Sequence, residues 1–143
     1  MLTLKNRTRL LDLILNDDRF NSFTLTARGK SMRPAIQPGI KLSFKKIPTG
    51  GSIGFGRIIL VKAKDKFLIH RIIYIKSTPE GKIYLSKGDC RFMADGWWKL
   101  EQILAQQEIT TILQVAVDYL FAVISLLTLL IGAGLRSSKI RRD

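Results

Sequence analysis

Short apolar runs separated by turn residues make up most of the chain, and one long uncharged run follows near its end. Some runs alternate apolar with polar side chains, the period of a half-buried strand, whereas others are continuous stretches rich in β-branched residues, typical of a buried strand. The charged turn 62–66 between two of the continuous runs predicts a hairpin. We expect strands at residues 23–26, 40–44, 58–61, 67–75, 82–85 and 109–117. The pattern predicts a mainly β (α+β) fold in which these strands form a small antiparallel sheet.

Residues 1–22 predict a short amphipathic helix ahead of the sheet. Its apolar stripe consists of positions 10, 11, 14 and 15, which recur at helical spacing. Asp12 interrupts this apolar run, and arginines and aspartates flank it, so the segment is too polar for a secretory signal peptide. We therefore interpret it as an amphipathic helix that precedes a single domain at residues 23–117.

The long uncharged run lies within residues 118–135 and predicts an apolar helix. Tyr119–Leu135 holds 17 consecutive uncharged residues without a polar face. At 1.5 Å per residue this run spans roughly 26 Å, slightly less than the ~30 Å hydrocarbon core of a bilayer. A small domain offers little room to bury such a helix, so we expect it to associate with the membrane of a bacterial or archaeal cell. The basic tail 136–143 favours a cytoplasmic C-terminus if the helix spans, whereas a re-entrant or interfacial helix would keep the whole chain in the cytoplasm.

Composition limits the partners and the chemistry. The 143 residues carry 24 Lys and Arg against 11 Asp and Glu, and this net charge of +13 favours an anionic partner such as a lipid surface. The 22 residues ahead of the predicted sheet leave no room for a helix-turn-helix, so we expect no nucleic-acid partner. One histidine and one cysteine, Cys90, exclude an internal disulfide and a His/Cys zinc site, so we expect no metal and no cofactor. The adjacent Trp97 and Trp98 are expected to close the core.

A hydroxyl, an imidazole and a carboxylate, in that order, can supply a nucleophile, a base and a group that orients the base. Ser31 lies in a turn bounded by glycine and proline, which can present a hydroxyl at the edge of a sheet. The only histidine, His70, follows it, and Asp89 and Asp95 come later. Taken singly, each has an ordinary structural interpretation, as a turn serine, a core histidine or a turn aspartate. Their combination is what indicates an enzyme.

His70 lies in the predicted strand 67–75, and both faces of that strand are largely apolar. Strand alternation places Tyr74 on the face of His70 and Ile75 on the opposite face. A strand that is apolar on both faces is central in its sheet, so the imidazole is partly desolvated and its neutral form is favoured. A neutral imidazole is what a general base requires.

Three motifs in this order resemble the conserved motifs of the signal peptidase I (S24/S26) superfamily. They are Gly-Lys-Ser-Met-Arg-Pro at 29–34, Ile-His-Arg-Ile-Ile at 69–73, and Ser-Lys-Gly-Asp at 86–89 with an aspartate six residues further on. The resemblance covers residues 23–117. Bacterial signal peptidases and self-cleaving repressors of this superfamily carry a lysine base, whereas this sequence has His70. The chain therefore resembles the Ser-His branch, which includes the archaeal and endoplasmic-reticulum signal peptidases.

The resemblance implies roles for the residues at matching positions. Ser31 would be the nucleophile and His70 the general base. Asp95 matches the aspartate that orients the histidine, and Asp89 matches the Gly-Asp carboxylate that supports the site. From the residues alone, either aspartate could orient the imidazole. Met32, which can also anchor its turn in the core, is the candidate substrate-binding side chain.

Some positions depart from the pattern of the superfamily. Gly29 stands where many relatives have a hydroxyl that helps to hold the oxyanion, so here the oxyanion site would rest on backbone N–H groups such as that of Ser31. Cys90 replaces the usual asparagine after Gly-Asp. We expect a serine endopeptidase of the signal peptidase type that cleaves a precursor or leader peptide by a Ser-His(-Asp) mechanism. The alternative is a non-catalytic relative that acts as a membrane-associated binding or regulatory domain.

Overall fold

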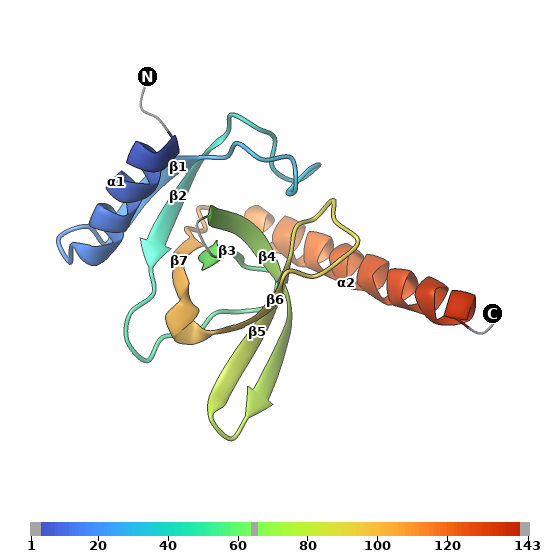
Figure 1. The fold of residues 1–143 in the computed structure, drawn as a ribbon. Helices are drawn as coiled ribbons and strands as arrows, with labels where there is room; N and C mark the ends of the chain where they lie inside the picture. Colours follow the sequence, from blue (N-terminus) through green and yellow to red (C-terminus); the bar gives the residue numbers. More distant parts are fainter. Residues whose placement is uncertain (1–3, 64–65, 141–143) are drawn as a thin grey trace.

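The computed structural model describes residues 4–63 and 66–140, in which seven strands form one antiparallel sheet with a helix at each end of the chain (Figure 1). The strands are ordered β1-β2-β7-β3-β4-β5-β6 across the sheet. The elements in chain order are α1 (Leu4–Asn16), β1 (Ser22–Thr26), β2 (Lys41–Lys46), β3 (Ile58–Ala63), β4 (Lys66–Thr78), β5 (Gly81–Lys87), β6 (Gly96–Lys99), the 3-10 turn η1 (Leu100–Gln102), β7 (Ile103–Gln107) and α2 (Ile112–Ile140). The fold is mainly β with flanking helices, which confirms the expected α+β class.

The β3–β4 hairpin lies inside the sheet and is buried on both faces. Alternate residues of β3 enter two separate cores: Ile58 and Leu60 pack in one, and Ile59 and Val61 in the other. All four are at most 3% exposed. This explains why the sequence shows a continuous apolar run here, since a strand covered on both sides has no polar face. The hairpin that we predicted from the charged turn is confirmed, although residues 64–65 lie outside the described part.

A β-bulge in β4 changes which face its later side chains occupy. The pairing of β4 with β5 shifts register between Ile72 and Tyr74. Beyond this shift Ile75 packs in the same core as Leu68 and Ile72, whereas Tyr74 is 47% exposed. The faces that simple alternation predicted for Tyr74 and Ile75 are therefore wrong, because the extra residue of a bulge inverts the alternation.

The N-terminal helix packs against the sheet through part of its predicted stripe. Leu11 is buried and Leu15 half-buried against the core that contains Ile58, whereas Leu10 is 49% exposed. The helix ends at Asn16 instead of continuing to residue 22, and residues 1–3 lie outside the described part. Asp17 accepts hydrogen bonds from the Arg19 side chain and backbone just beyond the helix.

The predicted strand at 109–117 is wrong. The last strand, β7, lies earlier, at Ile103–Gln107, and α2 begins at Ile112, ahead of the expected boundary at 118. The Thr111 hydroxyl accepts a hydrogen bond from the backbone N–H of Gln114 at 3.1 Å, which caps the first turn of α2. Thr-x-x-Gln before an apolar run is a known helix start. The helix continues to Ile140, so the predicted basic tail is helical as far as that residue, and 141–143 lie outside the described part.

The tryptophan pair forms a short edge strand that we did not predict. Trp97 and Trp98 belong to β6, which pairs with β5. Trp98 is half-buried in the core that contains Ile59, as expected, but Trp97 is 46% exposed and meets the ring of Tyr74 edge to face. Only one of the two rings therefore closes the core.

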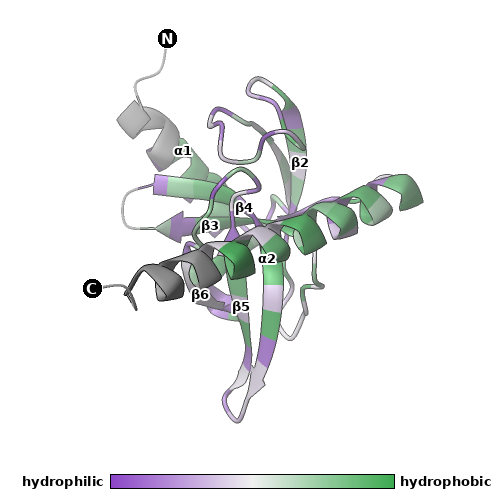
Figure 2. Ribbon diagram, turned by 90° about the vertical axis from the view of Figure 1, so that its right-hand side faces the viewer, coloured by the Kyte–Doolittle hydropathy of each residue, from purple (hydrophilic) through white to green (hydrophobic). Residues whose placement is uncertain are grey.

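The C-terminal helix crosses the outside of the sheet and is largely apolar (Figure 2). Most of its large apolar side chains are exposed. Within it, Ile112–Ala133 is long and apolar enough to cross a membrane, and only a small share of this stretch is buried against the protein. α2 is therefore a candidate membrane-associated helix.

Candidate active site

Ser31 lies in the turn that follows β1, and buried side chains on its C-terminal side hold that turn. Met32 and Ile36 are 4% and 7% exposed and belong to the core that also contains Ile58. The Ser31 carbonyl accepts a hydrogen bond from the backbone N–H of Cys90 at 2.9 Å, which ties the turn to the loop between β5 and β6. Within the described segments, the Ser31 N–H itself has no backbone acceptor. It is therefore free to donate to a bound group.

The structure brings Ser31, His70 and Asp95 together in one hydrogen-bonded line. His70 Nε2 is 2.9 Å from Ser31 Oγ, and His70 Nδ1 is 2.5 Å from Asp95 Oδ2. A carboxylate only accepts, so Nδ1 carries the proton and leaves Nε2 free to accept the serine proton. His70 comes from the middle of β4 and is 3% exposed, as its strand pattern predicted, and Asp95 directly precedes β6.

Asp89, our other candidate for the carboxylate beside His70, lies elsewhere. Both of its carboxylate oxygens accept hydrogen bonds from the Arg71 guanidinium at 2.9 Å. Arg71 is fully buried, and it also donates at 2.8 Å to Asp118 Oδ1 of α2. Burial pulls the pKa of Arg71 down, but hydrogen bonds and charges from Asp89 and Asp118 outweigh it and hold that pKa above its ordinary value. Of the two aspartates, Asp95 therefore contacts the imidazole and Asp89 neutralises a buried arginine.

Two further residues extend the line beyond Asp95. The Ser86 hydroxyl, on β5, donates to Asp95 Oδ2 at 3.1 Å, and the Trp98 indole N–H donates to Ser86 Oγ at 2.9 Å. The backbone N–H of Asp95 also donates to the Ser86 carbonyl at 2.9 Å. Ser86 is fully buried, so these bonds hold the carboxylate in one orientation. Ser86 belongs to the Ser-Lys-Gly-Asp motif, but the sequence does not predict its role, because a buried serine and a tryptophan have no spacing that marks a contact between them.

Gly88 is packed so closely against the pair of Ser31 and His70 that only glycine fits. A Cβ at this position would lie 2.8 Å from the Ser31 carbonyl oxygen, 2.9 Å from Ser31 Cβ and 3.1 Å from His70 Nε2. The preceding residue, Lys87, is fully buried, and its ammonium donates to the Gly88 carbonyl at 3.4 Å. Burial lowers the pKa of Lys87, and the negative charges of Asp89 and Asp95 oppose this shift.

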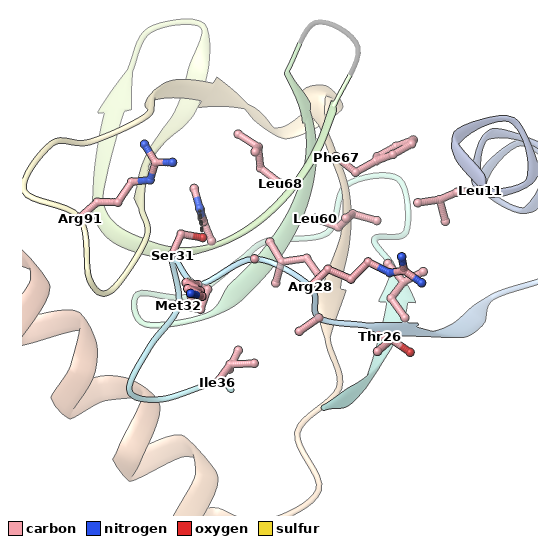
Figure 3. A pocket seen from close by; sticks show the side chains of 16 residues that line it. Leu11, Thr26, Arg28, Ser31, Met32, Ile36, Leu60, Phe67, Leu68 and Arg91 are labelled. Atoms are coloured by element: carbon pink, nitrogen blue, oxygen red, sulfur yellow. Dashed lines mark hydrogen bonds between the residues drawn. The ribbon is translucent and has the colours of Figure 1, made fainter. Parts of the chain in front are cut away.

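An apolar cavity of about 400 Å³ opens beside Ser31 and extends toward α1 (Figure 3). Ser31 and Arg91 lie at one end of the labelled side chains and Leu11 of α1 at the other, and His70 also lines the cavity. The remaining lining comes from the end of β1, the turn of Ser31, β3 and the first half of β4, and it includes Leu25, Ala27, Met32, Leu60, Phe67 and Leu68. Met32 thus lines the cavity, and because it is buried it also belongs to the hydrophobic core.

Cys90, a second nucleophilic side chain in the loop beside Ser31, does not contact the imidazole, whose ring nitrogens contact Ser31 and Asp95. Its thiol donates to the Lys30 carbonyl at 3.1 Å. The geometry of the site therefore places the serine hydroxyl, and not the thiol, on the imidazole.

No protein-family model matches the chain, and a search of curated proteins returns no match at the significance required. What the chain does must therefore be argued from its motifs and from the geometry of this site.

Proposed function

We propose that the protein is a serine endopeptidase of the signal peptidase type. The observation that carries the proposal is the hydrogen-bonded line from Ser31 Oγ through His70 to Asp95 at the mouth of an apolar cavity. The same three residues occupy the matching positions of the motifs that resemble the S24/S26 superfamily. The motifs and the geometry of the site thus favour the same three residues.

The mechanism follows from which atoms can hold a proton. His70 Nε2 takes the proton of Ser31 Oγ, and Oγ attacks the carbonyl carbon of the scissile peptide bond. The negative charge that develops on the carbonyl oxygen is stabilised by the free N–H of Ser31. The imidazolium, held by Asp95, then gives its proton to the leaving amine, and a water activated by His70 hydrolyses the acyl-enzyme.

The cavity favours an extended peptide with apolar or small side chains near the cut. Its walls are mainly aliphatic, and it runs between the end of β1, which is an edge strand, and β4. An extended peptide can add to such an edge through main-chain hydrogen bonds while its alternate side chains enter the cavity. The resemblance to signal peptidases then implies a precursor or leader peptide as substrate, and the apolar α2 favours a substrate processed at a membrane.

Labelling with a serine-directed acylating probe tests the proposal without a known substrate. We expect the wild-type chain to be acylated at Ser31, as located by peptide mass mapping, and Ser31→Ala to remain unlabelled. Ser77→Ala, which removes an exposed hydroxyl from β4 away from the cavity lining, is the matched control and should be labelled like the wild type. Wild-type protein that is folded yet unlabelled would instead favour the non-catalytic alternative, and a candidate precursor cleaved equally by Ser31→Ala would show that Ser31 is not the nucleophile.

A further inference from the structure

The C-terminal helix contacts the domain through a stripe that runs from Asp118 to Gly132, about half of its 29 residues. Asp118 binds Arg71 at 2.8 Å, the Ser125 hydroxyl donates to Asp89 Oδ1 at 3.3 Å, and a Cβ on Gly132 would lie 3.7 Å from the Phe92 carbonyl oxygen. Ala122, between the first two of these contacts, is fully buried. The stripe is thus built from small and polar residues that recur at helical spacing, and it faces the protein.

The opposite face of the helix is apolar and uncovered. Its most exposed large side chains, between 53% and 89%, are Ile112, Leu113, Leu120, Leu127, Leu130 and Ile131, whereas Tyr119 meets the ring of Phe55 edge to face. The loop between β5 and β6 adds two exposed apolar side chains, Phe92 at 74% and Met93 at 57%, and its backbone approaches α2 at Gly132 through the Phe92 carbonyl. This apolar surface, the outer face of α2 with Phe92 and Met93, is far larger than a set of scattered surface residues and therefore marks a contact site.

The attachment is incompatible with a helix that stands upright in a bilayer beside a domain in water. The contacts run from Asp118 to Gly132, which at 1.5 Å per residue is about 21 Å of helix axis, against a hydrocarbon core of ~30 Å. An upright α2 would carry the loop between β5 and β6 into the hydrocarbon together with the exposed charge of Arg91. A charged side chain at the bilayer centre costs at least about 2.5–3.5 kcal/mol. The water needed to hydrolyse an acyl-enzyme would also be excluded.

We propose that α2 lies in the plane of an anionic membrane, with its outer face, Phe92 and Met93 among the upper acyl chains and its stripe of small and polar residues toward the domain. The net charge of +13 matches a surface of anionic lipids. The loop that carries Asp89 and contacts α2 also binds the backbone of Ser31, so the cavity opens close to the membrane surface. The substrate is then a peptide bound at that surface, a consequence that rests on the proposed peptidase activity, whereas the membrane contact does not.

Depth measurements along the outer face distinguish an in-plane from an upright helix. In a Cys90→Ser background of the full chain, single cysteines replace Leu113, Leu120, Leu127 or Ile131 and carry an environment-sensitive fluorophore. These positions lie on the outer face and span about 27 Å of helix axis. With vesicles of equal parts phosphatidylglycerol and phosphatidylcholine, we expect all four fluorophores to be quenched at one shallow depth by lipids brominated along the acyl chain. Leu13→Cys, exposed on α1, is the control and should remain in water.

The other outcomes each overturn the proposal. Depths that increase to a maximum in the middle of the series would show an upright helix. A chain that does not bind vesicles but forms dimers as its concentration rises would show that a second copy covers the outer face of α2. Equal binding to purely phosphatidylcholine vesicles would refute the role of charge. Binding of unlabelled protein gives a second test. Leu127→Gln should lower the partition coefficient of the chain between vesicles and water about tenfold, and Leu13→Gln should leave this coefficient unchanged. None of these measurements requires catalysis, so they test the membrane contact independently of the labelling of Ser31, which tests the peptidase activity.

Discussion

Replacing Gly88 by alanine should displace the nucleophile without removing any group that takes part in the chemistry. The added Cβ would meet the Ser31 carbonyl oxygen at 2.8 Å and Ser31 Cβ at 2.9 Å, whereas ordinary contacts begin at 3.4 Å. The Ser31 turn must therefore retreat by about 0.6 Å. It cannot move freely, because buried Met32 and Ile36 anchor it in the core.

The expected loss can be estimated from that displacement. A misplacement of about 1 Å can cost a hundredfold in rate, so a shift of about 0.6 Å should cost between about tenfold and a hundredfold. This corresponds to about 1.4–2.7 kcal/mol of activation free energy. The measurement is the second-order rate constant for acylation of Ser31 by the serine-directed probe, taken on protein that circular dichroism shows to be folded.

Gly54→Ala is the matched control for this experiment. Its Cβ would find the nearest atom, Arg57 Cγ, at 3.7 Å, and its backbone φ is not in the left-handed region. It should therefore react at the wild-type rate. If folded Gly88→Ala were acylated as fast as Gly54→Ala, the proposed geometry of Ser31 and His70 would be wrong.

Three further predictions concern the groups around the imidazole. Asp95→Asn should slow acylation by about two orders of magnitude or more, because the amide no longer fixes the proton on His70 Nδ1. Asp89→Asn should chiefly lower stability, because buried Arg71 then lacks one of its negative charges. Acylation rates and urea unfolding separate the two variants, and equal effects of both variants on both measurements would contradict the assignment. Ser86→Ala should shift the pH profile of acylation, and Ser86→Thr, which keeps the hydroxyl, should restore it; a profile that stays unchanged in Ser86→Ala would limit this serine to packing. Lys87→Met should raise Tm at neutral pH, because the pKa of this lysine is lower in the folded than in the unfolded chain. The unfolded wild type then binds more protons, so wild-type stability rises toward pH 10.5 and the gain in Tm from Lys87→Met should shrink there. A gain in Tm that does not depend on pH would exclude the lowered pKa as its cause.

Local patterns along the chain were enough to predict most of the sheet. Alternation and continuous apolar runs located β1 to β5, because each of these strands presents at least one buried face and a turn residue ends it. β6 was missed because its four residues have no pattern of their own and are held by pairing with β5. The start of α2 was missed because its first turns are β-branched, although the Thr111 cap was visible in the sequence.

The residues of the candidate site were predictable from the sequence, but the contacts between them were not. The motifs singled out Ser31, His70 and two aspartates, and the structure places three of these four in contact. The choice between Asp89 and Asp95 depends on which side of β4 each carboxylate reaches, and no local pattern contains that information. Arg71, next to His70 in the same motif, was the available signal: a buried guanidinium needs a carboxylate on its own side of the strand.

The adjacency of His70 and Arg71 also has a practical use. Successive residues of a strand point to opposite faces. His70 therefore faces Ser31 and the cavity, whereas Arg71 binds Asp118 of α2, and no side chain belongs to both sites. The outer face of α2 can therefore be redesigned with polar residues to give a form that stays in solution for crystallisation and kinetics. Such a redesign must retain Asp118 and Ser125, since they belong to the network around the buried guanidinium.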